Sequence, residues 1–252
     1  MTLIRFEGTS DRGPSGTLWN SLVDWVTGTL HVAGCAFSGT DFFPYNAGDI
    51  TLSAAGSSAA TVSAVPFGVV SFAAAAGTYP GAGYVINEYV DLTSIRQVCV
   101  EARLSRTAGA TGAEITFIGF SDQLSDAVFD ASGGLDGGSG EDTLGLLWND
   151  DLTVDLVSVI NSATTVVLIH EVATAISNTG FHKFGLRIQQ HSSTKYTIYA
   201  SVDGAVKKVN VTSSQITQAA MRPVVVTVIS ATDAPEMAVD WHFVLDGTPG
   251  SA

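Results

Sequence analysis

Charged residues are scarce in this sequence, and positively charged residues are the scarcest. Asp, Glu, Lys and Arg make up 14% of the 252 residues, where about 25% is usual for a soluble domain. The chain has 11 Lys and Arg residues against 24 Asp and Glu, which gives a formal net charge of −13. The basic footprint of a nucleic-acid-binding protein is therefore lacking, and an anionic membrane surface would repel the chain. We expect neither nucleic acid nor a membrane among its partners.

Cysteines and long apolar runs are scarce as well. The two cysteines, Cys35 and Cys99, are too few for a disulfide framework, and no Cys-x-x-Cys pair is present. We therefore expect free, partly buried thiols and no zinc site. The best apolar stretch, residues 62–76, is shorter than the roughly 20 residues that a membrane-spanning helix needs. Glu7 and Asp11 stand where a signal peptide has its apolar core. These absences predict a soluble chain that is not exported.

Small neutral residues take the place of the missing charges, with Ser, Thr, Ala and Gly prominent in the sequence. A free monomer normally keeps surface charge because charge maintains solubility. A neutral surface therefore favours a protein that packs against neighbours. The alternative is an ordinary β-domain from an organism with low lysine usage.

Alternation of apolar and polar residues is the strongest pattern present, and it fills residues 181–245. A helix would place apolar residues three or four apart, so this spacing predicts half-buried antiparallel strands. Asp203-Gly204 stands where a two-residue hairpin needs positive φ. The alternation predicts eight core side chains: Phe184, Leu186, Ile188, Ile198, Val226, Val239, Trp241 and Phe243.

Strand-like segments with frequent turn signals also fill the middle of the chain. We expect strands at 84–90, 95–104, 114–121, 144–148, 153–160 and 165–172, with the second and third of these forming a hairpin. Together with 181–245 they predict an all-β fold, a two-sheet antiparallel β-sandwich. We expect one domain over 1–252, with residues 1–80 less regular and made of loops and edge strands.

The middle of the chain is strongly acidic, since no Lys or Arg occurs between Arg106 and Lys183. Clustered carboxylates on a flexible loop are typical of calcium sites, and the calcium candidates are Asp136, Glu141 and Asp142. No EF-hand spacing is present, and the glycine-rich tract 131–140 favours a solvated acidic loop. We therefore predict no metal and no cofactor.

A catalytic set is not recognisable in the sequence. Glu236 and Asp240 share a strand face, but four residues along a strand separate them by about 13 Å. Glycoside hydrolysis needs two carboxyl groups about 5 to 9.5 Å apart. The five histidines show no metal-ligand spacing and no recognisable nucleophile context. We expect no enzymatic activity and name no catalytic residue.

The segments FHKFGLRI, VDG, MRPVVVTVIS and MAVDWHFV, all within 181–245, resemble the C-terminal half of concanavalin A-like lectin/glucanase jelly rolls. They are especially similar to the versions found as bacteriophage virion proteins. The resemblance implies a non-enzymatic structural protein, a capsid decoration or cement protein that stabilises the phage head. Such a protein would be made in the host cytoplasm and would lie on the capsid exterior, with the major capsid protein or other virion proteins as partners.

The alternative is a carbohydrate-binding module on a phage fibre or spike, with a glycan as its partner. Sugar binding needs exposed aromatic side chains. The alternation turns Tyr196 and Trp241 inward, which leaves Tyr199 and Trp148 as candidates.

Assembly is the last expectation from the sequence. A neutral surface and the symmetry of a capsid favour a homo-oligomer, a trimer with an interface above about 1,000 Å² per pair. The aromatic cluster Phe42, Phe43 and Tyr45 is either a core plug or an assembly contact, and we name it as the contact segment. All four lysines lie in the last third of the chain and with Arg187 give one sheet face a positive character. They favour either ordering of neighbouring copies or protection of an edge strand against aggregation.

Overall fold

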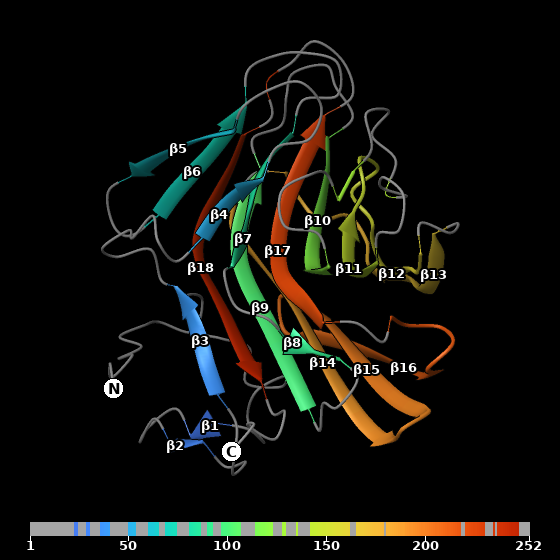
Figure 1. Ribbon diagram of the computed structural model, residues 1–252. Helices are drawn as coiled ribbons and strands as arrows, with labels where there is room; N and C mark the ends of the chain where they lie inside the picture. Colours follow the sequence, from blue (N-terminus) through green and yellow to red (C-terminus); the bar gives the residue numbers. More distant parts are fainter. Residues whose placement is uncertain are drawn as a thin grey trace.

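The computed structural model describes a protein made of β-strands packed as two antiparallel sheets, each with eight strands (Figure 1). This confirms the predicted all-β sandwich. Within the described part of the chain, no helix is long and apolar enough to cross a membrane. The described residues are 23–24, 29–30, 36–40, 50–53, 60–65, 69–74, 81–86, 90–92, 97–106, 114–122, 128–129, 135, 142–161, 165–178, 180–217, 220–229, 234 and 236–246.

Sheet I has the strand order β13-β12-β11-β10-β17-β7-β4, and β8 also pairs with β17. Its strands are β4 (Ile50–Ser53), β7 (Gly81–Ile86), β8 (Val90–Asp91), β10 (Glu114–Ser121), β11 (Thr143–Trp148), β12 (Val154–Val159), β13 (Val166–Ala173) and β17 (Ala220–Ile229).

Sheet II has the order β16-β15-β14-β9-β18-β6-β5, and β3 also pairs with β18. Its strands are β3 (Ala36–Thr40), β5 (Ala60–Val65), β6 (Val69–Ala74), β9 (Gln97–Arg106), β14 (His182–Ser192), β15 (Lys195–Val202), β16 (Ala205–Thr212) and β18 (Glu236–Asp246). A separate short pair joins β1 (Val23–Asp24) to β2 (Thr29–Leu30).

The main core fills the space between the two sheets. The inward positions predicted for β14, β15 and the start of β18 are confirmed, because Phe184, Leu186, Ile188, Ile198 and Val239 are all buried in one apolar cluster. The hairpin between β15 and β16 also has the expected turn, with positive φ at Asp203 (49°) and Gly204 (84°). Period-two alternation therefore fixed the inner face of sheet II at β14 and β15.

A second apolar cluster covers part of the outer face of sheet I. Val128, Phe129 and Leu135 pack there with side chains of β10, β12 and β17. Leu135 is buried, so the prediction that tract 131–140 is a solvated loop is wrong at this residue. Val226 is buried in this second cluster, whereas its neighbour Val225 faces the main core. The predicted inward face of β17 is therefore inverted, because both faces of this strand are buried and alternation cannot distinguish them.

The predicted hairpin between 95–104 and 114–121 is wrong. β9 pairs with β14 and β18 in sheet II, while β10 pairs with β11 and β17 in sheet I. The chain therefore crosses from one sheet to the other between these strands. Two consecutive amphipathic strands have the same sequence pattern whether they pair with each other or lie in facing sheets.

A β-bulge in β18 changes the face of every later residue. The pairing with β9 runs Val239 to Leu104 and then Trp241 to Arg103, so Asp240 is the extra residue. Beyond the bulge Val244 lies in the main core, and Phe243 is buried opposite Glu101 on the other face. Phe243 is thus buried but is wrong as a residue of the inter-sheet core, because one extra residue shifts a period-two pattern by one position. The side chain of Trp241 lies outside the described residues.

Candidate functional site

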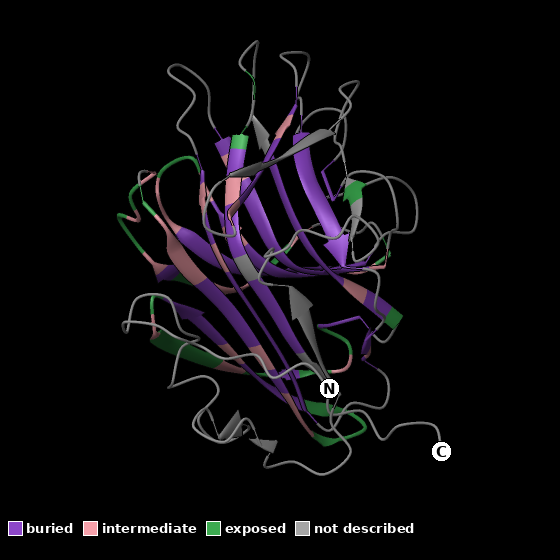
Figure 2. Cartoon of the chain, turned by 90° about the vertical axis from the view of Figure 1, so that its left-hand side faces the viewer, coloured by how far each residue is buried: buried purple, intermediate pink, exposed green. Residues whose placement is uncertain are grey.

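The outer face of sheet II is polar where β14, β15 and β16 lie side by side, at the lower right of Figure 1. Since the apolar residues of these strands point into the core, the residues between them point outward. Much of β16 is exposed, in contrast to the buried central strands of each sheet (Figure 2). We call eight polar and aromatic residues of this face the outer strip: Arg187, Gln189, His191, Lys195, Thr197, Tyr199, Lys208 and Asn210.

Strand register arranges the outer strip in rows. The first row places Tyr199 between Arg187 and Lys208. The second places Thr197 between Gln189 and Asn210. A third row holds Lys195, which pairs with Ser192 and Thr212. Neighbouring strands lie about 4.8 Å apart and a two-residue step spans about 6.7 Å, so three strands and three rows cover roughly 10 Å by 13 Å.

Arg187 and Tyr199 form the apolar and cationic end of the outer strip. The Arg187 guanidinium carbon lies 5.3 Å from the centroid of the Tyr199 ring, within the range of a cation–π contact. The side-chain oxygen of Gln97 accepts hydrogen bonds from Arg187 Nε at 3.1 Å and Nη2 at 3.2 Å when its amide is assigned to satisfy both. The guanidinium is therefore held in a defined orientation beside a half-buried ring.

Thr197 links the next row to the end of β14. Its hydroxyl donates to Asn210 Oδ1 at 2.8 Å and lies 2.8 Å from His191 Nε2. A hydroxyl has one proton, so a hydroxyl that donates to Asn210 accepts from His191. The imidazole therefore carries a proton on Nε2. His191 and Asn210 are exposed, and the buried Thr197 fixes them relative to each other.

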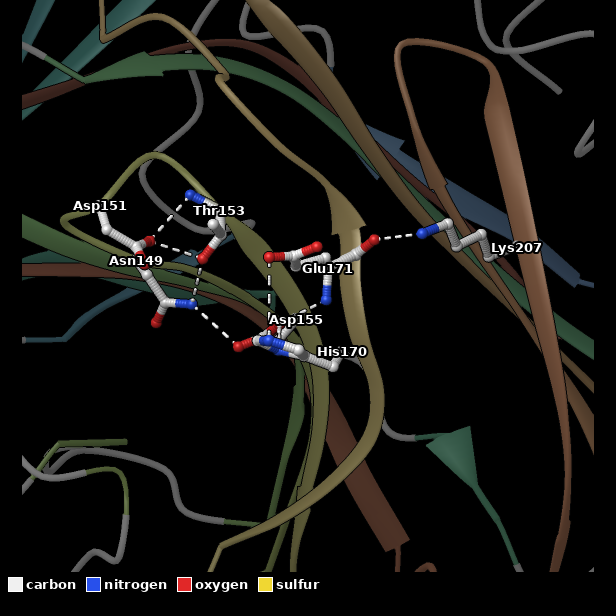
Figure 3. A network of polar contacts seen from close by, with 7 residues as sticks. All are labelled: Asn149, Asp151, Thr153, Asp155, His170, Glu171 and Lys207. Atoms are coloured by element: carbon white, nitrogen blue, oxygen red, sulfur yellow. Dashed lines mark hydrogen bonds and ion pairs between the residues drawn. The ribbon is translucent and has the colours of Figure 1, made fainter.

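A second polar network lies at the edge of sheet I (Figure 3). Asp155 is buried, and its carboxylate accepts hydrogen bonds from Asn149 Nδ2 (3.0 Å), His170 Nδ1 (2.9 Å) and the Glu171 amide (2.7 Å). The pairing of β12 with β13 shifts register here, and Glu171 has a φ of 52°. Asp155 thus satisfies the polar groups of an irregular strand edge, and Lys207 of β16 donates to the Glu171 carbonyl.

The remaining side chains of this network also have partners of their own. His170 is exposed, and its Nε2 lies 3.8 Å from Glu171 Oε1. The one hydroxyl of the network belongs to Thr153, and it donates to Asp151 Oδ1 at 2.6 Å. This hydrogen bond is the main reason that the pKa of Asp151 is lowered. Among the residues that the structure describes, no three His, Cys, Asp or Glu side chains could hold a metal ion.

Of the calcium candidates, only Asp142 is described, and its carboxylate is occupied. Oδ1 accepts the Asn161 amide at 2.5 Å and Oδ2 accepts the Thr217 hydroxyl. Asp142 therefore joins three segments of the sandwich as a buried acceptor. Asp136 and Glu141 lie outside the described residues, as do the contact candidates Phe42, Phe43 and Tyr45.

The acidic residues considered for catalysis have separate partners. Glu236 accepts from the Ser71 hydroxyl at 2.7 Å, and Asp240 pairs with Arg103 at 2.5 Å. Of the aromatic candidates for sugar binding, Trp148 is fully buried in the main core and is therefore ruled out as an exposed ring. Tyr196 is buried as predicted. Tyr199 lies on the outer face and is half-buried.

Sequence reasoning missed the buried acid Glu114. Its side chain is 3% exposed at the start of β10, and Oε1 accepts the Thr227 hydroxyl at 2.8 Å. Oε2 has no hydrogen-bond partner among the described residues. Burial raises the pKa of this carboxyl to about 7. The sequence did contain a signal for the burial of Glu114. Glu114 is an even number of residues from the core residues Ile118 and Phe120, so all three lie on the same face of the strand.

Comparisons with known proteins agree on the fold. No family model matches the sequence, and no curated protein matches it either. The structure is similar to a protein of unknown function from Shewanella oneidensis MR-1, with a TM-score of 0.54 and 15% identity over 95% of this chain and 96% of that chain. It is similar to peanut lectin, with a TM-score of 0.56 and 10% identity over 85% and 98% of the two chains. It is also similar to the alginate lyase vAL-1 from a Chlorella virus, with a TM-score of 0.52 and 9% identity over 86% and 100%.

These likenesses define the class of structure, a lectin-like jelly roll of two antiparallel sheets. At such low sequence identities they show the fold alone, and the same fold occurs in a lectin and in an alginate lyase. The bacteriophage setting that the sequence resemblance implied has no counterpart in these matches and remains a prediction.

Proposed function

We propose that this protein binds carbohydrate, and that the outer strip is the binding surface. The observation that carries the proposal is Tyr199, a half-buried ring on the outer face of a lectin-like sheet, with planar polar side chains around it. Small-molecule sites combine an apolar or aromatic surface with a few well-placed polar groups. A sugar ring presents both, since its C–H face packs on an aromatic ring and its hydroxyls form hydrogen bonds.

The rows of the outer strip fit this mode of binding. Tyr199 offers a ring face with little conformational entropy to lose on binding. Asn210 and Gln189 each offer an amide that can donate and accept, and Arg187 is already oriented by Gln97. Because the strands fix these groups, few side chains must be ordered when a ligand binds.

The test is glycan binding by the intact protein and by a Tyr199→Ala variant, measured on a glycan array and then by calorimetry. We expect the variant to lose most of the affinity, because it loses the apolar platform. Lys207→Ala is the control, since Lys207 is adjacent in sequence to Lys208 of the strip but donates to β13 of the other sheet. A Tyr199→Ala variant that binds as tightly as the unchanged protein would refute the proposed surface.

Binding without cleavage is part of this proposal. It rests on the sequence, in which no catalytic set was predicted, and the lyase among the structural neighbours makes a direct test necessary. Incubation of the protein with the bound glycans should release no reducing ends and no unsaturated products. Product formation that survives purification to homogeneity would show that the protein is an enzyme.

We propose assembly as a second role, on the strength of strand β13. β13 ends sheet I, and its Val166 and Val167 are 48% and 50% exposed. An exposed apolar edge strand without lysine or proline is a template for pairing with another chain. This supports the self-association predicted from the neutral surface. The trimer, the capsid exterior and the major capsid protein as partner are proposals that rest on the sequence.

Light scattering tests the assembly role. We expect a homo-oligomer that dissociates when Val167 is replaced by Lys, because a charged edge strand resists pairing. A protein that is monomeric at all concentrations before any substitution would refute this role.

A further inference from the structure

We propose that the glycan bound by the outer strip is anionic, a polysaccharide that carries carboxylate or sulfate groups. This inference rests on the proposed function and adds the chemical class of the ligand. Its basis is the local charge of the outer strip, which is positive although the net charge of the whole chain is negative.

The outer strip is positively charged in a protein whose formal net charge is −13. None of the 24 Asp and Glu residues lies in β14, β15 or β16. Three positively charged residues of the strip face outward, and Lys195 and Lys208 are exposed. Two more, Arg103 and Lys183, stand opposite each other farther along the same face.

Among the described residues, the acids beside the outer strip lie on neighbouring strands or in a turn, and Glu101 pairs with Gly185, two residues from Arg187. Glu101 and Asp240 belong to β9 and β18, and both are buried. Asp240 is paired with Arg103, and Asp203 in the β15–β16 turn is bound to His182 and to the Lys183 amide. The two exposed lysines of the strip therefore have no carboxylate on their own three strands.

Local charge decides binding at physiological ionic strength. Charges are screened beyond about 8 Å at 0.15 M salt, so the acidic residues elsewhere on the chain have little effect on a ligand in the strip. A ligand that also extends far beyond the strip meets the negative remainder of the protein. DNA, with one charge per roughly 1.7 Å, and an anionic membrane are therefore disfavoured relative to a polysaccharide with spaced charges.

The geometry also suits a sugar acid. Arg187 presents a planar guanidinium next to the Tyr199 ring, and an arginine binds a carboxylate or sulfate with two parallel hydrogen bonds. Lys208 stands on the opposite side of the same ring in the same row. A sugar ring packed on Tyr199 would thus have a cation on either side for its acidic substituent.

Affinity electrophoresis and calorimetry would test this with four polymers: polygalacturonate and alginate as acidic probes, and mannan and a mixed-linkage β-glucan as neutral probes. We expect the acidic polymers to bind more tightly, and their affinity to fall as NaCl rises from 50 to 500 mM. The double variant Lys195→Gln/Lys208→Gln should weaken acidic binding about five- to tenfold, from two exposed charge pairs of up to about 1 kcal/mol each. Lys207→Gln is the matched control and should bind as the unchanged protein does.

The outcomes separate this inference from the proposed function. Equal binding of neutral and acidic polymers, with Tyr199 still required, would overturn the anionic ligand and leave carbohydrate binding in place. Binding of none of the four polymers would remove the basis of both. Preferential binding of single-stranded DNA or of anionic vesicles over the polymers would show that the strip binds another class of polyanion and would overturn the inference.

Discussion

Glu114→Gln is expected to stabilise the protein at pH 8 and to leave its stability unchanged at pH 4. The carboxyl group lies between the sheets, and burial raises its pKa from 4.5 to about 7. The amide of Gln can still accept the Thr227 hydroxyl, as Oε1 does now. The substitution therefore removes the ionisation and preserves size and the main contact.

The magnitude follows from the difference between the folded and unfolded pKa values. A group whose pKa is raised in the folded state favours folding below its unfolded pKa, and this contribution is lost as the pH rises through the folded pKa. Each unit of difference corresponds to about 1.4 kcal/mol. Ionisation of Glu114 should thus cost the native protein roughly 3 kcal/mol between pH 4 and pH 8, and Gln should avoid that cost.

The assay is urea unfolding of both proteins at pH 4, 6 and 8, followed by tryptophan fluorescence, for which the fully buried Trp148 is a reporter. Glu171→Gln makes the same chemical change on an exposed side chain and serves as the control. The difference between protein and variant should grow with pH only for Glu114. A difference that stays constant from pH 4 to pH 8 would show that Glu114 is solvated or has an ionic partner, and the reasoning from burial would be wrong.

Three further predictions concern buried side chains of sheet II. His242 is fully buried and contacts the Tyr84 hydroxyl at 3.1 Å, and burial lowers the pKa of its imidazole to about 3. The free energy of unfolding should therefore fall as the pH drops below 6.5. His242→Gln should lessen that fall in urea unfolding curves. Cys99 is fully buried, and burial is the largest cause of the raised pKa of its thiol. In a Cys35→Ser background, a thiol reagent at pH 8 should react with Cys99 only after the protein unfolds. Rapid reaction of the native protein would contradict the burial of Cys99. Phe184→Ala should cost about 3–5 kcal/mol of unfolding free energy, and a loss below about 1 kcal/mol would contradict a packed core at this position.

Much of sheet II was predictable because its strands have one apolar face. The expected turn at Asp203-Gly204 and the inward side chains of β14 and β15 are confirmed for that reason. The face of β17 was not predictable, since Val224, Val225 and Val226 are all buried and belong to two clusters. A strand that is apolar on both faces carries no period-two signal.

The β-bulge in β18 and the crossover from β9 to β10 could not be predicted from the sequence for a different reason. The extra residue Asp240 reverses the faces of β18 beyond it, and no local motif distinguishes it from a regular strand residue. The crossing from β9 to β10 depends on which strands are neighbours in space, and the sequence of two amphipathic strands does not encode that choice. For the candidate site, the alternation left Tyr199 as an outward aromatic residue, while its neighbours Arg187 and Lys208 required the register to be known.

The central claim, that the outer strip binds a glycan, is tested most directly by an NMR titration of the isotopically labelled protein with oligosaccharides of galacturonate. The account predicts that the amide signals of Thr197, Tyr199 and Asn210 shift first and saturate together, and that signals of the exposed edge strand β13 stay in place. Shifts confined to β13 or to the outer face of sheet I, with the signals of β14 to β16 unchanged, would contradict it.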